Sequence, residues 1–266
     1  MDKIFEYVDF PNMRYLMKGL TFTVSRCAEV LDKLLVGFNK DTQIPDRIVS
    51  WNAENPSSRS PLHFPGRGRF IVEINELLTK KGKLHTVQLL ENSAEKEPAP
   101  VVFLKMHSPS LNIPMRTEIP LRALIKGGAS LRDTYSVYLH ALLCDDGRNF
   151  TYYGVTKRGW NVRWNEHALS AIRSESPRLF PLKLKKLMDA RVAQLYGSGS
   201  THPRLTGIIS AICGVGLTED QAMESEEYLV DKYSLASKHP NGLNMIPGGR
   251  ARRRNGSDKL IYPSES

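Results

Sequence analysis

The sequence predicts an α+β fold in which a small antiparallel β-sheet, flanked by helices, follows an N-terminal α/β accessory region. The first observation is a hairpin signal, because the β-prone runs YSVYLHALL and FTYYGVT flank a turn that contains Asp-Gly. The second is the segment NVRWNEHALSAIR, which follows the hairpin directly and has helical composition with an apolar stripe. The third is a capping-box pattern, Thr218 with Gln221, that opens a helix through EDQAMESEEYLVDKY. We therefore expect a core at residues 126–249.

The residues before this core, 1–125, predict a separate accessory region. Residues 24–38 place apolar side chains at helical spacing and predict an amphipathic helix. Residues 51–69 are rich in Pro, Ser, Gly and Asn, which favour a loop. The runs RFIVEI, LHTVQLLE and VVFLKMH then predict a small antiparallel meander. The flexible pair Gly127-Gly128 marks the boundary to the core.

Two further segments differ from the hairpin and helices of the core. Residues 174–218 separate the helix after the hairpin from the capped helix, and we interpret them as an insertion. Residues 250–266 begin with a run of arginines and are otherwise mostly polar, so they predict a basic, flexible tail.

Composition and the N-terminal sequence indicate the cellular compartment of the protein. A hydrophobic content of 41% with 24% charged residues is typical of a soluble globular chain, and no stretch reaches the roughly 18 apolar residues of a membrane span. The N-terminus lacks the pattern of a secretory signal, so we expect a cytoplasmic protein without membrane contact. Cys27, Cys144 and Cys213 are scattered and form no CxxC pair, which argues against a disulfide framework and a thiolate zinc site.

Charge points to a partner class. A formal net charge of +9 produces a surface field that attracts polyanions, since each neutralised phosphate releases a condensed counterion. Nucleic acid is therefore the leading partner, although many basic proteins bind nothing anionic.

Four residues around the hairpin carry candidate chemistry. Arg163 and His167 are four apart on a predicted helix and share one face. An arginine fork suits a phosphate oxygen and a histidine can move a proton, which fits phosphoryl chemistry. Tyr138 and Tyr152 lie on opposite arms of the hairpin, so their hydroxyls could converge near Arg163. The alternative is ordinary packing of the tyrosines and a solvated face for Arg163 and His167.

The order of these parts resembles the GIY-YIG nuclease family. Its paired tyrosine motifs correspond here to Ser136-Val137-Tyr138 and Tyr152-Tyr153-Gly154, and Arg163 with His167 follows as in restriction-type members. Ser136 replaces the first glycine of the family and Tyr153 its isoleucine.

The resemblance continues near the C-terminus. Glu226 matches the metal-binding glutamate of the family, with Glu224 and Glu227 as alternatives. Asn244 resembles its closing asparagine, and Gly248-Gly249 resembles an ending common among phage-type members.

The resemblance implies a Mg²⁺-dependent DNA endonuclease, with Mn²⁺ able to substitute. An activated water would hydrolyse the phosphodiester, with Tyr138 or His167 assisting deprotonation. Glu226 would hold the cation and Arg163 would steady the non-bridging oxygens. Tyr152 would position the water or phosphate, and Asn244 would orient the site.

Five basic residues are candidates for contacts to the DNA backbone, their alternative being a solvated helix face. They are Lys157, Arg158, Lys183, Lys185 and Lys186. By elimination, sequence recognition falls to residues 174–218 and the N-terminal region, which could also serve dimerisation.

Four functional readings remain open. A restriction-type enzyme acting on duplex DNA is favoured by the Arg163 and His167 pair and by the insertion. Because a symmetric cutter needs two active sites, it implies a homodimer. The alternatives are a homing-type endonuclease, a non-catalytic DNA-binding or regulatory protein, and an RNA-directed nuclease, which only the resemblance disfavours.

Overall fold

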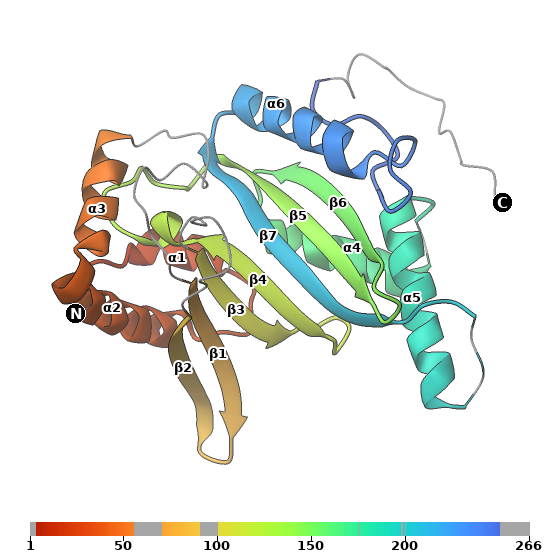
Figure 1. Ribbon diagram of the computed structural model, residues 1–266, viewed down its shortest axis with the longest axis horizontal. Coiled ribbons are helices and arrows are strands. Elements are labelled where there is room, and N and C mark those ends of the chain that lie inside the picture. The colour runs from red at the N-terminus through yellow and green to blue at the C-terminus, as the bar shows by residue number, and fades with distance from the viewer. Residues whose placement is uncertain are drawn as a thin grey trace.

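The computed structural model describes residues 4–55, 71–90, 101–174, 176–197, 199 and 201–250, which fold around one large β-sheet. The sheet has seven strands in the order β2-β1-β3-β4-β7-β5-β6 (Figure 1). The expected small antiparallel sheet is therefore wrong, because the sheet is larger and mixed: β1 pairs with β3, and β4 with β7, in parallel.

The strands of the sheet come from residues 71 to 217 of the chain. The strands are Ile71–Thr79 (β1), Gly82–Leu90 (β2), Val101–His107 (β3), Pro114–Pro120 (β4), Tyr135–Cys144 (β5), Asn149–Thr156 (β6) and Leu205–Leu217 (β7). The predicted hairpin is confirmed as β5 and β6, which pair antiparallel across the Asp-Gly turn.

Six α-helices accompany the sheet within the described residues. They are Phe10–Leu16 (α1), Val24–Thr42 (α2), Ile44–Glu54 (α3), Trp160–Arg173 (α4), Leu179–Leu195 (α5) and Glu219–Leu229 (α6). A 3₁₀ turn, Leu121–Leu124 (η1), and a π-helical turn, Val230–Ser234 (η2), complete them. The capping box of Thr218 and Gln221 is confirmed at the start of α6. None of these described helices has the length and apolar character needed to cross a membrane.

Strand β7 explains why the sheet is larger than expected. It pairs in parallel with β4 and antiparallel with β5, so it joins the N-terminal strands to the hairpin. Its sequence, LTGIISAICGVGL, is a near-continuous apolar run typical of a strand inside a sheet, without the polar alternation that marks a half-exposed strand. The segment interpreted as an insertion, 174–218, therefore contains α5 and a central strand. The boundary expected at residue 126 separates strands of this one sheet.

The antiparallel meander expected in the N-terminal region is also wrong. β1 and β2 do form an antiparallel hairpin, but β3 pairs with β1 in parallel and with β4 antiparallel. The chain between β2 and β3, residues 91–100, lies outside the described residues, as do the tail from residue 251 and most of the loop expected at 51–69.

The helices divide between the two faces of the sheet. Because successive side chains of a strand point to opposite faces, Tyr138 joins a large buried cluster with Trp164 of α4 and Phe180 of α5. Its neighbour Val137 joins a small cluster with Ala222 of α6. α4 and α6 thus cover opposite faces of the β5–β6 hairpin (Figure 1).

Leu104→Ala in β3 and Leu142→Ala in β5 should each lower the free energy of unfolding by about 2–5 kcal/mol, because both side chains are fully buried and leave cavities. Since both strands belong to one sheet, we expect each substitution to move the same single transition in urea unfolding followed by fluorescence and circular dichroism. Leu195→Ala, at a side chain 76% exposed, is the control and should change stability by less than about 0.5 kcal/mol. Two transitions, each moved by only one substitution, would contradict this expectation.

Candidate active site

The β5–β6 hairpin places three ring side chains on the face that α4 covers. Tyr138 and His140 are two residues apart in β5 and point the same way. The register pairs Tyr138 with Gly154 and His140 with Tyr152. The ring centroid of Tyr138 lies 4.7 Å from that of His140 and 6.5 Å from that of Tyr152. The two tyrosines predicted from the sequence are therefore neighbours.

Gly154 provides the space that the Tyr138 ring occupies. A Cβ atom added at Gly154 would lie 2.5 Å from the Tyr138 hydroxyl oxygen and 2.6 Å from its Cζ. Any side chain there would collide with the phenol. The glycine of the second motif thus has a physical reason: it lets the tyrosine of the first motif lie across β6.

Helix α4 directs Arg163 and His167 towards the same place. The His167 ring is buried, with its centroid 5.0 Å from that of Tyr152 and 6.2 Å from that of His140. Arg163, one turn earlier, is close enough to the Tyr138 hydroxyl to affect its pKa. The structure therefore brings four of the expected residues together with His140. We call these five residues the hairpin–helix cluster.

His140 is the residue that the sequence analysis missed. It is fully buried, and its Nδ1 lies 2.8 Å from the hydroxyl oxygen of Ser210 in β7. The signal was its position two residues after Tyr138 in a predicted strand, which places both on one face. The contact to Ser210 is not predictable from local patterns, because it depends on the pairing of β5 with the distant strand β7.

The cluster contains an unusual concentration of unsatisfied polar atoms. Seven buried side-chain atoms lack a hydrogen-bond partner among the described residues, and four of them belong to the cluster. The four are Tyr138 Oη, His140 Nε2, Arg163 Nε and His167 Nε2. Buried polar groups are normally paired, so such a group calls for bound water or for a ligand whose atoms complete the bonds. This pattern marks the cluster as a candidate site.

Burial controls the protonation state of Tyr138 and His167, the two candidates for the general base. Burial raises the pKa of Tyr138, the neighbouring Tyr152 raises it further, and the lowering effect of Arg163 does not compensate. The Tyr138 phenol is therefore protonated at neutral pH. Burial, assisted by the positive charges of Arg163 and Arg178, lowers the pKa of His167 to about 3. His167 is therefore a neutral imidazole at pH 7.

The charge of Arg163 is secure in this environment. Burial disfavours its guanidinium, but Tyr138 and Glu166 more than compensate and raise its pKa. Its Nη1 donates to Glu166 Oε2 at 2.6 Å. The guanidinium faces the Tyr138 hydroxyl without a hydrogen bond of normal geometry between them.

Among the three glutamates that the sequence left open, Glu226 is the one whose charge affects a residue of the cluster. Its charge raises the pKa of Tyr138. Its Oε2 accepts a hydrogen bond from the Gly249 backbone N–H at 2.9 Å. Glu224 and Glu227 instead line a separate surface hollow beside the end of α6.

The Gly248-Gly249 pair allows the chain to pass against α6. A Cβ at Gly248 would lie 2.8 Å from the Glu226 carbonyl oxygen, and one at Gly249 would lie 2.1 Å from that of Met223. Gly249 also has φ +58°, which favours glycine. This close approach delivers the N–H that holds the Glu226 carboxylate.

Asn244 holds the outer strand β6 to the C-terminal segment. Its Oδ1 accepts from Tyr153 N at 3.0 Å, and its Nδ2 donates to Tyr153 O at 2.9 Å. The Ser234 hydroxyl donates to the same Oδ1 at 2.7 Å. Asn244 thus lies next to the second tyrosine motif, with its amide engaged by backbone and hydroxyl.

The five basic candidates do not form one patch. Lys157 and Arg158 occupy the turn between β6 and α4, beside the cluster. Lys183 Nζ lies 4.4 Å from the centroid of an aromatic ring at the opposite end of β6. At the rise of a strand, that end is roughly 20 Å from the turn that contains Lys157 and Arg158. Lys185 pairs with a carboxylate of its own helix at 2.6 Å, and Lys186 lies on the same helix α5.

The Glu226 carboxylate is chemically compatible with Mg²⁺. A carboxylate is a hard oxygen ligand, and Mg²⁺ commonly takes one or two carboxylates with waters and substrate phosphate oxygens. No group of three or more His, Cys, Asp or Glu suited to a metal occurs among the described residues. Glu226, fixed by the Gly249 N–H, is the residue that would hold the ion.

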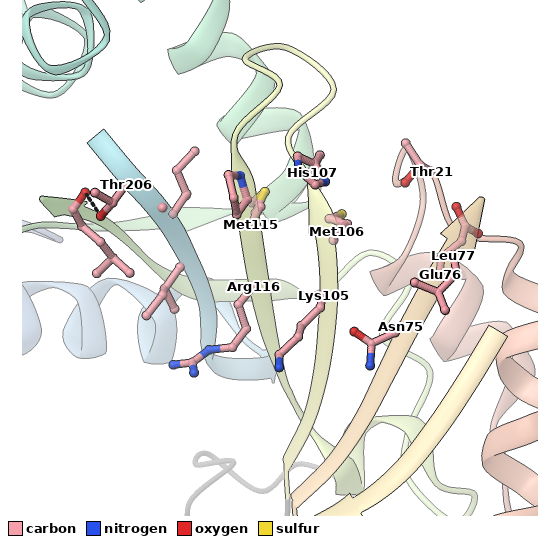
Figure 2. Close-up of a pocket in the computed structure, with 15 residues that line it drawn as sticks. Thr21, Asn75, Glu76, Leu77, Lys105, Met106, His107, Met115, Arg116 and Thr206 are labelled. Carbon is pink, nitrogen blue, oxygen red and sulfur yellow. Dashed lines mark hydrogen bonds between the residues drawn. The ribbon is translucent and has the colours of Figure 1, made fainter. Parts of the chain in front are cut away.

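A second concave region lies away from the cluster, among β1, β3, β4 and β7 (Figure 2). It has a volume of about 540 Å³ and an apolar lining that includes Met106, Met115 and Ile208. Lys105 and Arg116 extend in the same direction there (Figure 2), but they pair with acidic neighbours at 2.6 and 2.7 Å. No residue of the hairpin–helix cluster lines this hollow.

Searches against protein-family models, curated proteins and solved structures found no match for this chain. The functional argument therefore rests on the motif residues and on the geometry of the cluster.

Gly154→Ala should destabilise the protein by about 1–3 kcal/mol, because the new methyl group overlaps the Tyr138 phenol. In a Tyr138→Leu background the same substitution should cost clearly less, and a double-mutant cycle from urea unfolding would measure that coupling. Gly37→Ala, in α2 with open space around the added atom, should have no such cost and is the matched control. Equal costs of Gly154→Ala in the two backgrounds would refute the proposed contact.

The stability of the protein should fall as the pH drops from 6.5 towards 3. In that window the unfolded chain binds a proton at His167 that the folded protein excludes, since the folded pKa is lowered from 6.5 to about 3. Each such proton changes the free energy of unfolding by up to about 1.4 kcal/mol per pH unit. Urea unfolding at several pH values should therefore give a shallower loss for His167→Gln than for the unsubstituted protein. Parallel curves would show that His167 is not held neutral by the fold.

Proposed function

We propose that this protein is a metal-dependent DNA endonuclease that hydrolyses phosphodiester bonds at the hairpin–helix cluster. The observation that carries the proposal is that a phenol, a neutral imidazole and a guanidinium lie close together. Each of these groups has a buried polar atom without a hydrogen-bond partner. Glu226 lies within electrostatic range of the phenol. These groups match, position by position, the residues that support the resemblance to GIY-YIG nucleases.

Their protonation states favour one division of labour between the two candidate bases. The Tyr138 phenol stays protonated, so it donates a hydrogen bond to the attacking water or to a phosphate oxygen. The His167 imidazole is neutral at pH 7 and accepts the proton from that water. Burial makes His167 a weak base in the free protein, and an adjacent phosphate charge raises its pKa when substrate is bound.

The remaining residues bind and orient the substrate. Arg163 donates to the non-bridging oxygens as a charged fork. Tyr152, which is partly exposed and packs against His167, lies where it can position the water or the phosphate. Mg²⁺ or Mn²⁺ at Glu226 would supply stabilisation of the charge on the leaving oxygen. Asn244 orients the site indirectly through the backbone of Tyr153.

We further propose restriction-type, site-specific cleavage of duplex DNA inside the cell. The net charge of +9 favours a polyanionic substrate. The Arg163 and His167 pair favours the restriction type over the homing type. Cleavage of both strands at a symmetric site would require a homodimer with two clusters. Lys157 and Arg158 are the basic candidates placed to contact the backbone beside the cluster.

The purified protein should convert plasmid DNA of varied sequence into discrete fragments when Mg²⁺ or Mn²⁺ is present. Glu226→Gln should lower the cleavage rate at least about 100-fold, because it removes the charge that binds the cation while keeping an oxygen for the Gly249 N–H. Glu224→Gln and Glu227→Gln are matched controls on the same helix and should retain the rate. The readout is the initial rate of plasmid linearisation on agarose gels.

The outcomes separate the remaining functional classes. Cleavage only at one long asymmetric site would indicate a homing-type enzyme. Specific DNA binding without cleavage, unchanged by Glu226→Gln, would indicate a regulatory protein. Cleavage of RNA in preference to DNA would overturn the proposed substrate. If Glu227→Gln abolished cleavage and Glu226→Gln retained it, the metal ligand would be Glu227 and not Glu226.

A further inference from the structure

Glu166 links two arginines of the candidate active site through its two carboxylate oxygens. Its Oε2 lies 2.6 Å from Arg163 Nη1, and its Oε1 lies 2.8 Å from Arg158 Nη2. The two arginines come from different elements, Arg158 from the turn after β6 and Arg163 from the first turns of α4. One anion with two acceptor oxygens thus brings the two guanidinium groups to a common point.

The surroundings hold this arrangement in place on the backbone side. The Arg158 N–H donates to the Thr156 hydroxyl at 3.0 Å, and the carbonyl oxygen of Lys157 accepts from the Tyr15 hydroxyl at 3.1 Å. The turn is therefore tied to both β6 and α1. These contacts to the Arg158 backbone and its neighbour do not involve the Arg158 side chain.

The exposure of the three side chains shows that the contact is accessible to solvent. The exposed fraction is 61% for Arg158, 40% for Glu166 and 25% for Arg163. Ion pairs this exposed add little to the free energy of unfolding, so a contribution to stability does not explain the arrangement. A phosphate diester also presents two anionic oxygens, and guanidinium groups bind it in the same charge-assisted manner.

We propose that Arg158 and Arg163 form a single phosphate-binding site and that the Glu166 carboxylate occupies it in the free protein as an internal substitute for a DNA phosphate. This inference rests on the proposed function and adds two features to it. Arg158 becomes a partner of Arg163 at the same phosphate. Glu166 becomes a competitor that the DNA must displace, which weakens binding to any phosphate that does not reach both arginines.

The test is binding of a fluorescein-labelled DNA duplex by the full-length chain, measured by anisotropy without divalent cation. Glu166→Gln keeps the size of the side chain and removes its charge, so the arginines become available and affinity should rise about tenfold. That factor corresponds to a wild-type population in which roughly one tenth has the site open. The slope of log K against log salt should change by less than about 0.9, because the bound state makes the same phosphate contacts in both proteins.

Matched variants separate local competition from a general charge effect. Glu224→Gln, on the opposite face of the hairpin, changes the net charge by the same amount and should alter affinity by less than about twofold. Arg158→Gln should weaken binding, and Glu166→Gln should give a smaller gain in that background, because Glu166 then competes only for Arg163. Glu166→Ala repeats the test with a smaller side chain, and thermal unfolding shows that each variant is folded.

The results distinguish this inference from the proposed function. If the wild-type protein binds and cleaves DNA but Glu166→Gln and Glu166→Ala bind no better than Glu224→Gln, the competition is refuted while the nuclease proposal stands. Weaker binding by both Glu166 variants would also refute it and would make Glu166 a positioning residue for Arg163. If the wild-type protein neither binds nor cleaves DNA, both proposals fail.

Discussion

The pairing of β7 between β4 and β5 is the constraint on which the rest of the molecule depends. β7 is hydrogen-bonded on both edges, so removing it would separate the N-terminal strands from the hairpin that carries the site. It also supports the site directly, because the Ser210 hydroxyl of β7 lies against the buried ring of His140. The same strand therefore makes the sheet continuous and contacts the buried His140 of the cluster.

The cluster combines tight packing with incomplete hydrogen bonding. Tyr138 fits only because Gly154 has no side chain, and the His167 ring packs against Phe180 with centroids 4.9 Å apart. A core of this kind normally satisfies its polar atoms, and leaving several unpaired costs stability. Under the proposed function, a substrate with oxygen atoms would complete these bonds. Arg163 and Tyr152 are the partly exposed members of the cluster.

Local patterns in the sequence were sufficient for the hairpin, for α4 and for the capped start of α6, because turn chemistry and capping are encoded by neighbouring residues. They were also sufficient to nominate Tyr138, Tyr152, Arg163 and His167, whose convergence follows from one hairpin and the next helix. Tertiary pairing was not accessible in this way. The parallel pairing of β3 with β1, and of β7 with β4, joins segments far apart in the chain, and neither leaves a local signal. The roles of these residues and of Glu226 stay proposals.

The most direct test of the account is the position of the metal ion. Crystals of the protein grown with duplex DNA and Mn²⁺ would locate the ion by its anomalous scattering. The account predicts a peak at the Glu226 carboxylate, on the side of Tyr138 and Arg163, with a DNA phosphate in contact. A peak in the hollow lined by Glu224 and Glu227, or a phosphate bound away from Arg163, would contradict the assignment of the hairpin–helix cluster as the active site.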